Sequence, residues 1–243
     1  MINHIFLQAR VNSTRFPNKI LQKIGDKTIL EVIVERIKKI ENINRIILVT
    51  GSNKNNNELV NKAEELNLDV FCGDEENILD RFYHAANEFH SENIIRITGD
   101  CPLIDFKLIN KGLKIYHSEL INILTNTKKR SYPHGLDFEI FSKESLDIAW
   151  RDVVKNGKNK KGEFINPVQY MMNSGKFKIY NLENAFDQSK IRITIDYPED
   201  LIVISKIYKE LFNKNEDFAS EEIIKFLDLH PELVKINEKF EYM

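Results

Sequence analysis

The feature that most constrains this 243-residue sequence is the alternation of short β-branched runs with longer segments of helical period. Runs at 4–9 (HIFLQA), 45–50 (RIILVT), 69–71 (DVF) and 94–98 (IIRIT) read as strands. The intervening segments at about 29–40, 56–66 and 76–90 carry apolar residues every three to four positions, and Thr28 with Glu31 forms a capping-box pattern before the first. This order predicts an α/β fold with a mostly parallel central sheet and helices on both faces.

The second half of the chain is expected to be less regular. It predicts helices at about 106–117, 142–153 and 198–212, a short helix capped by Asn166, and strands at 121–125, 177–182 and 191–195, with extended chain at 135–141. A polar loop, KNGKNKKG, occupies 155–162. Because no repeat, linker or low-complexity segment interrupts the chain, we expect a single domain with an elaborated second half.

Charge and cysteine content exclude several classes of protein. The net charge of −2 gives no overall cationic field for nucleic-acid binding. The two cysteines, Cys72 and Cys101, lie far apart and show no metal-ligand spacing. The first residues do not resemble a secretory signal, and no apolar run approaches the roughly 20 residues that span a bilayer. We therefore expect a cytoplasmic protein that binds neither nucleic acid nor membrane.

A cationic loop follows the first predicted strand. Residues 8–19 (QARVNSTRFPNK) gather Arg10, Arg15 and Lys19 with the hydroxyls of Ser13 and Thr14. Arginine forks, a lysine charge and turn N–H groups together suit a polyphosphate, although a solvated basic loop has the same composition. Neither the GxxxxGK[ST] loop nor the GxGxxG fingerprint is present, which removes the usual support for P-loop phosphoryl transfer and for hydride transfer.

Two aspartates follow predicted strands elsewhere in the chain. Asp100 comes after the strand at 94–98 and Gly99, which permits a sharp turn, and Asp196 comes after the strand at 191–195. Each aspartate alone is equally well explained as a turn former or helix N-cap. Together, at neighbouring strand ends opposite a cationic loop, they predict a Mg²⁺ site completed by water and the phosphates of a nucleoside triphosphate.

Other polar residues carry weaker signals. Asp137 and Glu139 alternate on one face of the extended segment at 135–141, which suits the hydroxyls of a sugar; a solvent-facing strand edge explains them nearly as well. The six histidines show no metal-ligand cluster, and no serine lies in a GxSxG elbow.

Five sequence blocks then occur in a recognisable order. They are LQARxxSTRxPxK in the first loop, ILDRF at 78–82, RITGDCPLID at 96–105, GLDFEIF at 135–141 and RITIDYPEDL at 192–201. The set resembles, across almost the whole chain, the cytidylyltransferase family of spore-coat polysaccharide synthesis proteins, which is related to the acylneuraminate and KDO cytidylyltransferases.

This resemblance implies a Rossmann-like nucleotidyltransferase that transfers CMP from CTP to a sugar or sugar acid for surface polysaccharide or glycan synthesis, releasing pyrophosphate with Mg²⁺ as cofactor. Residues 1–125 would form the nucleotide-binding half and residues 126–243 the sugar-binding half with the second metal ligand. Relatives often dimerise through the second half, so a homodimer is expected. Implied nucleotide contacts are Leu7, Gln8, Ala9, Arg10, Ser13, Arg15, Lys19, Arg81 and Thr98. Implied sugar contacts are Asp137, Glu139 and Glu163, the implied metal ligands are Asp100 and Asp196, and Arg10 and Lys19 join those two aspartates as the implied catalytic set.

One departure from the family pattern concerns the acceptor. Where the family commonly shows Glu-His before Thr-Pro, this chain reads Glu163-Phe164-Ile165-Asn166-Pro167. The acceptor sugar therefore cannot be carried over from relatives. Two alternatives also stay open: the same chemistry with GTP or UTP on a sugar phosphate, and a nucleotide-sugar-dependent glycosyltransferase, for which Asp137-Phe138-Glu139 is a loose imitation of a DxD motif.

Overall fold

The computed structural model describes residues 1–155 and 166–240. Its main sheet has seven strands in the order β5-β4-β1-β6-β8-β7-β9. These strands are β1 (Asn3–Gln8), β4 (Arg45–Thr50), β5 (Asp69–Cys72), β6 (Asn93–Thr98), β7 (Ile123–Thr125), β8 (Phe138–Ser142) and β9 (Ile179–Asn181). Only β8 runs antiparallel to its neighbours β6 and β7, so the predicted mostly parallel α/β sheet is confirmed.

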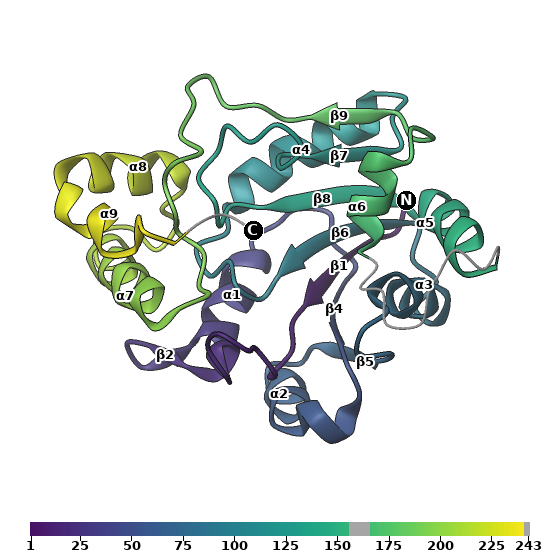
Figure 1. Ribbon diagram of the computed structural model, residues 1–243, viewed down its shortest axis with the longest axis horizontal. Helices are drawn as coiled ribbons and strands as arrows, with labels where there is room; N and C mark the ends of the chain where they lie inside the picture. Colours follow the sequence, from purple (N-terminus) through teal and green to yellow (C-terminus); the bar gives the residue numbers. More distant parts are fainter. Residues whose placement is uncertain (156–165, 241–243) are drawn as a thin grey trace.

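Helices cover both faces of this sheet, as predicted (Figure 1). The apolar core on one face contains side chains of α1 (Ile29–Ile37), α2 (Asn53–Glu65), α4 (Phe106–Ser118), α7 (Pro198–Phe212), α8 (Ser220–Leu229) and α9 (Pro231–Asn237), of which the last three lie beside one another. The other face packs against α3 (Ile78–Glu88), α5 (Lys143–Trp150) and α6 (Pro167–Asn173). Along β1, Ile5 and Leu7 belong to the first core and Phe6 to the second, because successive strand residues point to opposite faces. In the part of the chain described, every helix is too short or too polar to cross a bilayer.

Local sequence accounts for several helix ends. The predicted capping box is present, with the Glu31 amide donating to Thr28 Oγ1 at 3.2 Å and the Thr28 amide to Glu31 Oε2 at 2.7 Å. Asn166 caps α6 by accepting from the Val168 amide at 3.0 Å, with Pro167 in the first turn.

The predicted strand at 191–195 is wrong. In this segment only Arg192 makes a β-bridge, to His134. The amide of Ile193 donates to the His134 carbonyl at 2.7 Å, and that of Ile195 to the Asp100 carbonyl at 2.8 Å. The segment is mostly apolar, and Arg192 to Ile195 are buried. It cannot pair with β6, because β1 and β8 already occupy both edges of that strand, and its backbone hydrogen bonds therefore go to two loops.

Smaller differences lie at element ends. The helix predicted at 142–153 is α-helical only to Trp150 and continues as the π-helical turn η2 (Arg151–Lys155). The extended segment predicted from residue 135 pairs only from Phe138, since Gly135 turns the chain with φ of 116°. A small hairpin, β2 (Lys23–Ile24) with β3 (Lys27–Thr28), and the 3-10 turn η1 (Lys19–Leu21) were not predicted. Most of the loop predicted at 155–162, and Glu163, lie outside the described residues.

Candidate active site

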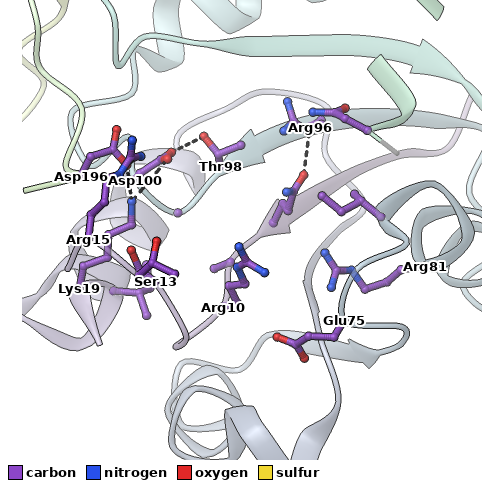
Figure 2. Close-up of a pocket in the computed structure, with 17 residues that line it drawn as sticks. Arg10, Ser13, Arg15, Lys19, Glu75, Arg81, Arg96, Thr98, Asp100 and Asp196 are labelled. Atoms are coloured by element: carbon purple, nitrogen blue, oxygen red, sulfur yellow. Dashed lines mark hydrogen bonds and ion pairs between the residues drawn. The ribbon is translucent and has the colours of Figure 1, made fainter. Parts of the chain in front are cut away.

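A pocket of about 550 Å³ opens at the carboxyl-terminal ends of β1 and β6 (Figure 2). Parallel α/β sheets place ligands at this edge, because helix N-termini and loop N–H groups gather there. The lining residues are Gln8, Ala9, Arg10, Ser13, Thr14, Arg15, Lys19, Ile20, Glu75, Ile78, Arg81, Arg96, Thr98, Gly99, Asp100, Asn166 and Asp196. The tertiary structure thus brings the cationic loop and both aspartates together.

The cationic loop is held in place by its own backbone and by one buried asparagine. The amides of Ser13 and Asn18 both donate to the Val11 carbonyl at 3.0 Å. The Val11 amide donates in turn to Asn56 Oδ1 at 2.9 Å, and Asn56 is fully buried in α2. Asn18 has a left-handed φ of 55°, which turns the chain into η1 and directs Lys19 inward. The loop is therefore a shaped lip of the pocket.

Lys19 lies between the two aspartates. Its ammonium donates to Asp196 Oδ1 at 3.0 Å and to the Ile195 carbonyl at 2.5 Å, and it lies 3.6 Å from Asp100 Oδ2. Figure 2 shows these three side chains meeting on one side of the pocket, beside Arg15. One lysine thus neutralises part of the charge of two carboxylates delivered by distant parts of the chain.

Asp196 is further fixed by two arginines. Arg15 lies 2.7 Å from its Oδ1, and Arg192 donates to its Oδ2 at 3.1 Å. Beneath it, the buried carboxylate of Asp200 accepts the Asp196 amide at 2.8 Å and pairs with Arg192 through two bonds of 2.9 Å. Asp196 is therefore not the N-cap of α7, because Tyr197 occupies that position before Pro198. Asp200 accepts the Tyr197 amide in this turn, and the Asp196 side chain lines the pocket.

Asp100 is held as a carboxylate. Burial alone would raise its pKa, but the Lys19 ammonium and hydrogen bonds from Thr98 and Cys101 outweigh burial and lower the pKa to about 2. The Thr98 hydroxyl donates to Asp100 Oδ1 at 2.5 Å. Thr98 therefore lines the pocket and orients the aspartate as well.

Gly99 lies in the turn expected after β6, which the Cys101 amide closes by donating to the Thr98 carbonyl at 3.2 Å, and it also allows a close approach of two strand ends. Its φ is not left-handed, but a Cβ at this position would lie 2.7 Å from Ala9 Cβ and 3.0 Å from Ile20 Cδ1. Its amide donates to the Gln8 carbonyl at 2.9 Å. Glycine is needed here because the ends of β6 and β1 approach each other closely.

The remaining predicted residues occupy different positions. Arg10 is exposed at the rim, and Arg81 is buried in the wall, whereas Leu7 is buried beneath the pocket and does not line it. Asp137 pairs with Arg130 at 2.8 Å, outside the lining. Glu139 is buried and accepts from Arg96 Nη1 at 2.7 Å.

Three polar lining residues were missed as ligand contacts by sequence reasoning. Arg96 lies in β6 and donates to Gln8 Oε1 at 2.8 Å. A charged residue within an otherwise apolar strand was the feature of the sequence that could have indicated it. Glu75 follows β5 in an acidic loop that reads as solvated turn. Asn166 was expected only as a helix cap, yet it also faces the pocket.

The residues fit a magnesium ion only in combination with a substrate. Among the described residues no group of three His, Cys, Asp or Glu side chains is arranged to bind a metal. Asp100 and Asp196 offer two hard carboxylates, and Oδ2 of Asp100 receives no hydrogen bond from the described residues. Mg²⁺ commonly takes one or two carboxylates and completes its shell with water and phosphate oxygens, so this donor set suits it.

A pocket with a cationic lip and two convergent carboxylates, at the carboxyl edge of a mostly parallel sheet, suits a nucleotide, and a similar solved structure is that of a cytidylyltransferase, so the fold is that of a Rossmann-like nucleotidyltransferase. The model of one family, described as cytidylyltransferase, matches residues 5–225. The chain belongs to the cytidylyltransferase family.

Three individual proteins illustrate what this chain is similar to. A protein of Methanocaldococcus jannaschii that is named only as uncharacterised is 36% identical, over 95% of this chain and 92% of its own. The spore coat polysaccharide biosynthesis protein SpsF of Bacillus subtilis is 25% identical, over 93% of this chain and 94% of its own. The structure of a cytidylyltransferase from Leptospira borgpetersenii is similar with a TM-score of 0.88 and 28% identity, covering 100% of this chain and 99% of that one.

Proposed function

We propose that this cytidylyltransferase transfers CMP from CTP to a sugar or sugar acid, with release of pyrophosphate, in the synthesis of a surface polysaccharide or glycan. The observation that carries the proposal is the meeting of Lys19, Asp100 and Asp196 in one pocket with the cationic loop. The similarity to SpsF, over almost the full length of both chains, supports the sugar acceptor and the polysaccharide role.

The triphosphate would lie along the cationic lip. Arg10, Arg15 and Lys19 line the pocket and supply positive charge, while Ser13 adds a hydroxyl. Arg15 and Lys19 are presently paired with Asp196, so phosphate oxygens would compete with that carboxylate for their N–H groups. Charge-assisted hydrogen bonds of this kind orient a phosphate and stabilise the charge that accumulates as pyrophosphate leaves.

Asp100 and Asp196 are the residues that would hold Mg²⁺. When bound, the ion supplies charge neutralisation at the α-phosphate and at the leaving pyrophosphate. The low pKa of Asp100 keeps that side chain anionic throughout the neutral range, as a ligand requires. Asp196 is kept in place by the Arg192–Asp200 pair beneath it.

The reaction exchanges one phosphorus–oxygen bond for another. A hydroxyl oxygen of the acceptor forms a bond to the α-phosphorus, the bond from that phosphorus to the bridging oxygen of pyrophosphate breaks, and the hydroxyl loses its proton. The part of the chain after residue 125 contributes Asn166 and Asp196 to the pocket lining. Asn166 stands where this sequence departs from the family pattern, so we propose that it helps to select the acceptor, with Glu163 as a further sugar contact.

Asp137 and Glu139 were expected to face the sugar. Each is paired with an arginine, Asp137 with Arg130 and Glu139 with Arg96. We propose that they act on the acceptor side through these pairs, by fixing the arginines.

The proposed homodimer is tested by light scattering, in which a monomer at micromolar concentration contradicts it.

Calorimetric titration of CTP, GTP, UTP and ATP, each with and without Mg²⁺, tests the nucleotide. Selective, metal-enhanced binding of CTP is expected. Binding of GTP or UTP instead would keep the chemistry and change the product, whereas binding of nucleoside diphosphate sugars alone would favour a glycosyltransferase.

Pyrophosphate release tests the two carboxylates. Asp100→Asn and Asp196→Asn should each abolish Mg²⁺-dependent release of pyrophosphate from CTP in the presence of acceptor sugars. Asp26→Asn, an exposed aspartate outside the pocket lining, is the matched control and should leave release unchanged. Release that persists in both pocket variants would contradict the assigned roles.

A further inference from the structure

Helix α9 and the residues after it pack against the turn that carries Asp196. Figure 1 shows α9 beside α7, the helix that this turn precedes. Two residues of this part of the chain, Asn237 and Phe240, lie after residue 225, where the match to the family model ends. They therefore add contacts near the pocket that the matched segment of the chain does not contain.

Asn237 contacts the carboxylate that lies beneath Asp196. Its side chain is 1% exposed, and its Nδ2 donates to Asp200 Oδ1 at 2.8 Å and to the Arg192 carbonyl at 3.3 Å. The other oxygen of Asp200 accepts the Asp196 amide at 2.8 Å. Hydrogen bonds to a charged acceptor are stronger than those between neutral groups. One buried carboxylate thus joins α9 to the backbone of a proposed metal ligand.

Phe240 stacks on Tyr197, the residue that follows Asp196. The two ring centroids lie 3.9 Å apart and the ring planes differ by 8°. Both side chains are half-buried, so each ring covers a face of the other that water would otherwise reach. Such a contact adds to the free energy of burial and restricts the rotamers of Tyr197.

The Tyr197 ring lies in turn beside the guanidinium of Arg15. Arg15 Cζ is 5.2 Å from the ring centroid, which is within the range of a cation–π contact, and its Nη2 is 2.7 Å from Asp196 Oδ1. In the proposed reaction a phosphate oxygen competes with Asp196 for the Arg15 N–H groups. The ring attracts the guanidinium through its π face and accepts none of those in-plane donors. It therefore supports Arg15 before and after the exchange of partners.

We propose that Asn237 and Phe240 are positioning residues for nucleotidyl transfer. Phe240 fixes Tyr197 and through it Arg15, whereas Asn237 fixes Asp200 and through it Asp196. Neither residue lines the pocket, so each acts through the side chain that it supports. This inference rests on the proposed binding of a nucleoside triphosphate at Arg15 and Asp196.

Phe240→Leu tests the aromatic support, because leucine keeps an apolar side chain but cannot stack on Tyr197. We expect the dissociation constant of CTP with Mg²⁺, measured by calorimetry, to rise about three- to tenfold. Phe240→Tyr retains the stacking ring and should bind CTP as wild type does.

Phe212→Leu is the matched control. Phe212 is also half-buried and stacks on a tyrosine, Tyr208 of α7, with ring centroids 4.9 Å apart. The Lys27 ammonium lies 4.9 Å from the Phe212 centroid, so this group too combines an aromatic pair with a cation. All three residues lie outside the pocket lining, and Phe212→Leu should therefore leave CTP binding unchanged.

A double-mutant cycle distinguishes positioning from a general loss of stability. Arg15→Gln should itself weaken CTP binding, and adding Phe240→Leu should weaken it no further, because the side chain through which Phe240 acts has been removed. A purely structural role of Phe240 would give the same loss in both backgrounds.

Asn237→Leu tests the buried support with a side chain of similar size that has no donor. Because Asp200 then holds the turn of Asp196 less firmly, the Mg²⁺ concentration that gives half of the enhancement of CTP binding should rise about threefold or more. Asn93→Leu is the control: Asn93 is buried at the start of β6, away from the pocket, and its Nδ2 donates to Asn3 Oδ1 at 3.1 Å. It should lose stability without a change in the Mg²⁺ requirement.

The outcomes separate this inference from the proposed function. Failure of wild type to bind CTP would overturn the proposed function and the inference together. If wild type binds CTP, the role of Phe240 is overturned by unchanged binding in Phe240→Leu, by an equal loss in Phe212→Leu, or by an undiminished effect in the Arg15→Gln background. The role of Asn237 is overturned by an unchanged Mg²⁺ requirement in Asn237→Leu, or by an equal rise in Asn93→Leu.

Discussion

Replacing Asp200 by asparagine should destabilise the protein strongly, although Asp200 does not line the pocket. Its side chain is fully buried and accepts five hydrogen bonds of 2.8–2.9 Å, two from Arg192 and three from the Asn237 side chain and the amides of Asp196 and Tyr197. Burial by itself opposes ionisation, but these bonds outweigh it and lower the pKa of Asp200.

The magnitude follows from which oxygen becomes an amino group. If it is Oδ1, the new donor faces Arg192 Nε and Asn237 Nδ2; if it is Oδ2, it faces Arg192 Nη2 and two backbone amides. The first arrangement is the less costly, and Asp196 still offers Arg192 a bond of 3.1 Å. Breaking a buried pair costs about 3–5 kcal/mol, so we expect about 3 kcal/mol here.

Urea unfolding followed by circular dichroism measures this loss, and the melting temperature should fall by roughly 6–12 °C for a chain of this size. Asp217→Asn is the matched control, because Asp217 is exposed and pairs with Lys39 at the surface; it should unfold with wild type. A loss below about 1 kcal/mol in Asp200→Asn would refute the reasoning that this carboxylate anchors the turn of Asp196.

Three further predictions follow from the same geometry. Lys19→Gln removes the ammonium shared by both carboxylates and should weaken CTP binding about tenfold or more by calorimetry; an unchanged dissociation constant would contradict its role. Gly99→Ala places a Cβ 2.7 Å from that of Ala9 and should cost about 1–3 kcal/mol in urea unfolding; wild-type stability would show that the two strand ends separate easily. Asp100 has a pKa of about 2 in the folded protein against an ordinary 3.8, so its contribution to stability is present above pH 4 and is lost as the pH falls towards 2. In Asp100→Asn the slope of the unfolding free energy against pH should therefore be smaller than in wild type between pH 4 and pH 2. An equal slope would contradict the lowered pKa.

Much of the fold was predictable because it depends on local periodicity. The predicted strands and helices of the first half, together with α4, α6 and α7, correspond to observed elements within a few residues. The segment 191–195 failed because a buried extended chain and a sheet strand have the same apolar, β-branched composition. Whether such a segment pairs depends on whether a sheet edge is free beside it, and that is a property of the assembled fold.

The candidate site divides in the same way. Arg10, Arg15, Lys19 and Asp100 were chosen because they follow predicted strands, and they line the pocket at the edge where β1 and β6 end. Asp196 lines the pocket too, although the strand predicted before it is absent, and Thr98, implied by the family resemblance, lines it at the end of β6. Glu75 could not be chosen as a pocket residue from the sequence, since its place in the pocket wall depends on the space that Gly51 leaves for its carboxylate. Asp137 and Glu139 have the same appearance in the sequence as free carboxylates, yet arginines brought by other elements pair with both.

The sequence by itself determined the α/β class, the order of the elements and the residue types at each strand end, because hydrophobic period and turn chemistry act over a few neighbouring residues. Only the tertiary structure decided which charges are shared. Lys19 meets two aspartates that lie 81 and 177 positions further along the chain, and Arg192 is divided between Asp196 and Asp200. Electrostatic interactions depend on distance and burial in space, and neither quantity is contained in the spacing of residues along the chain.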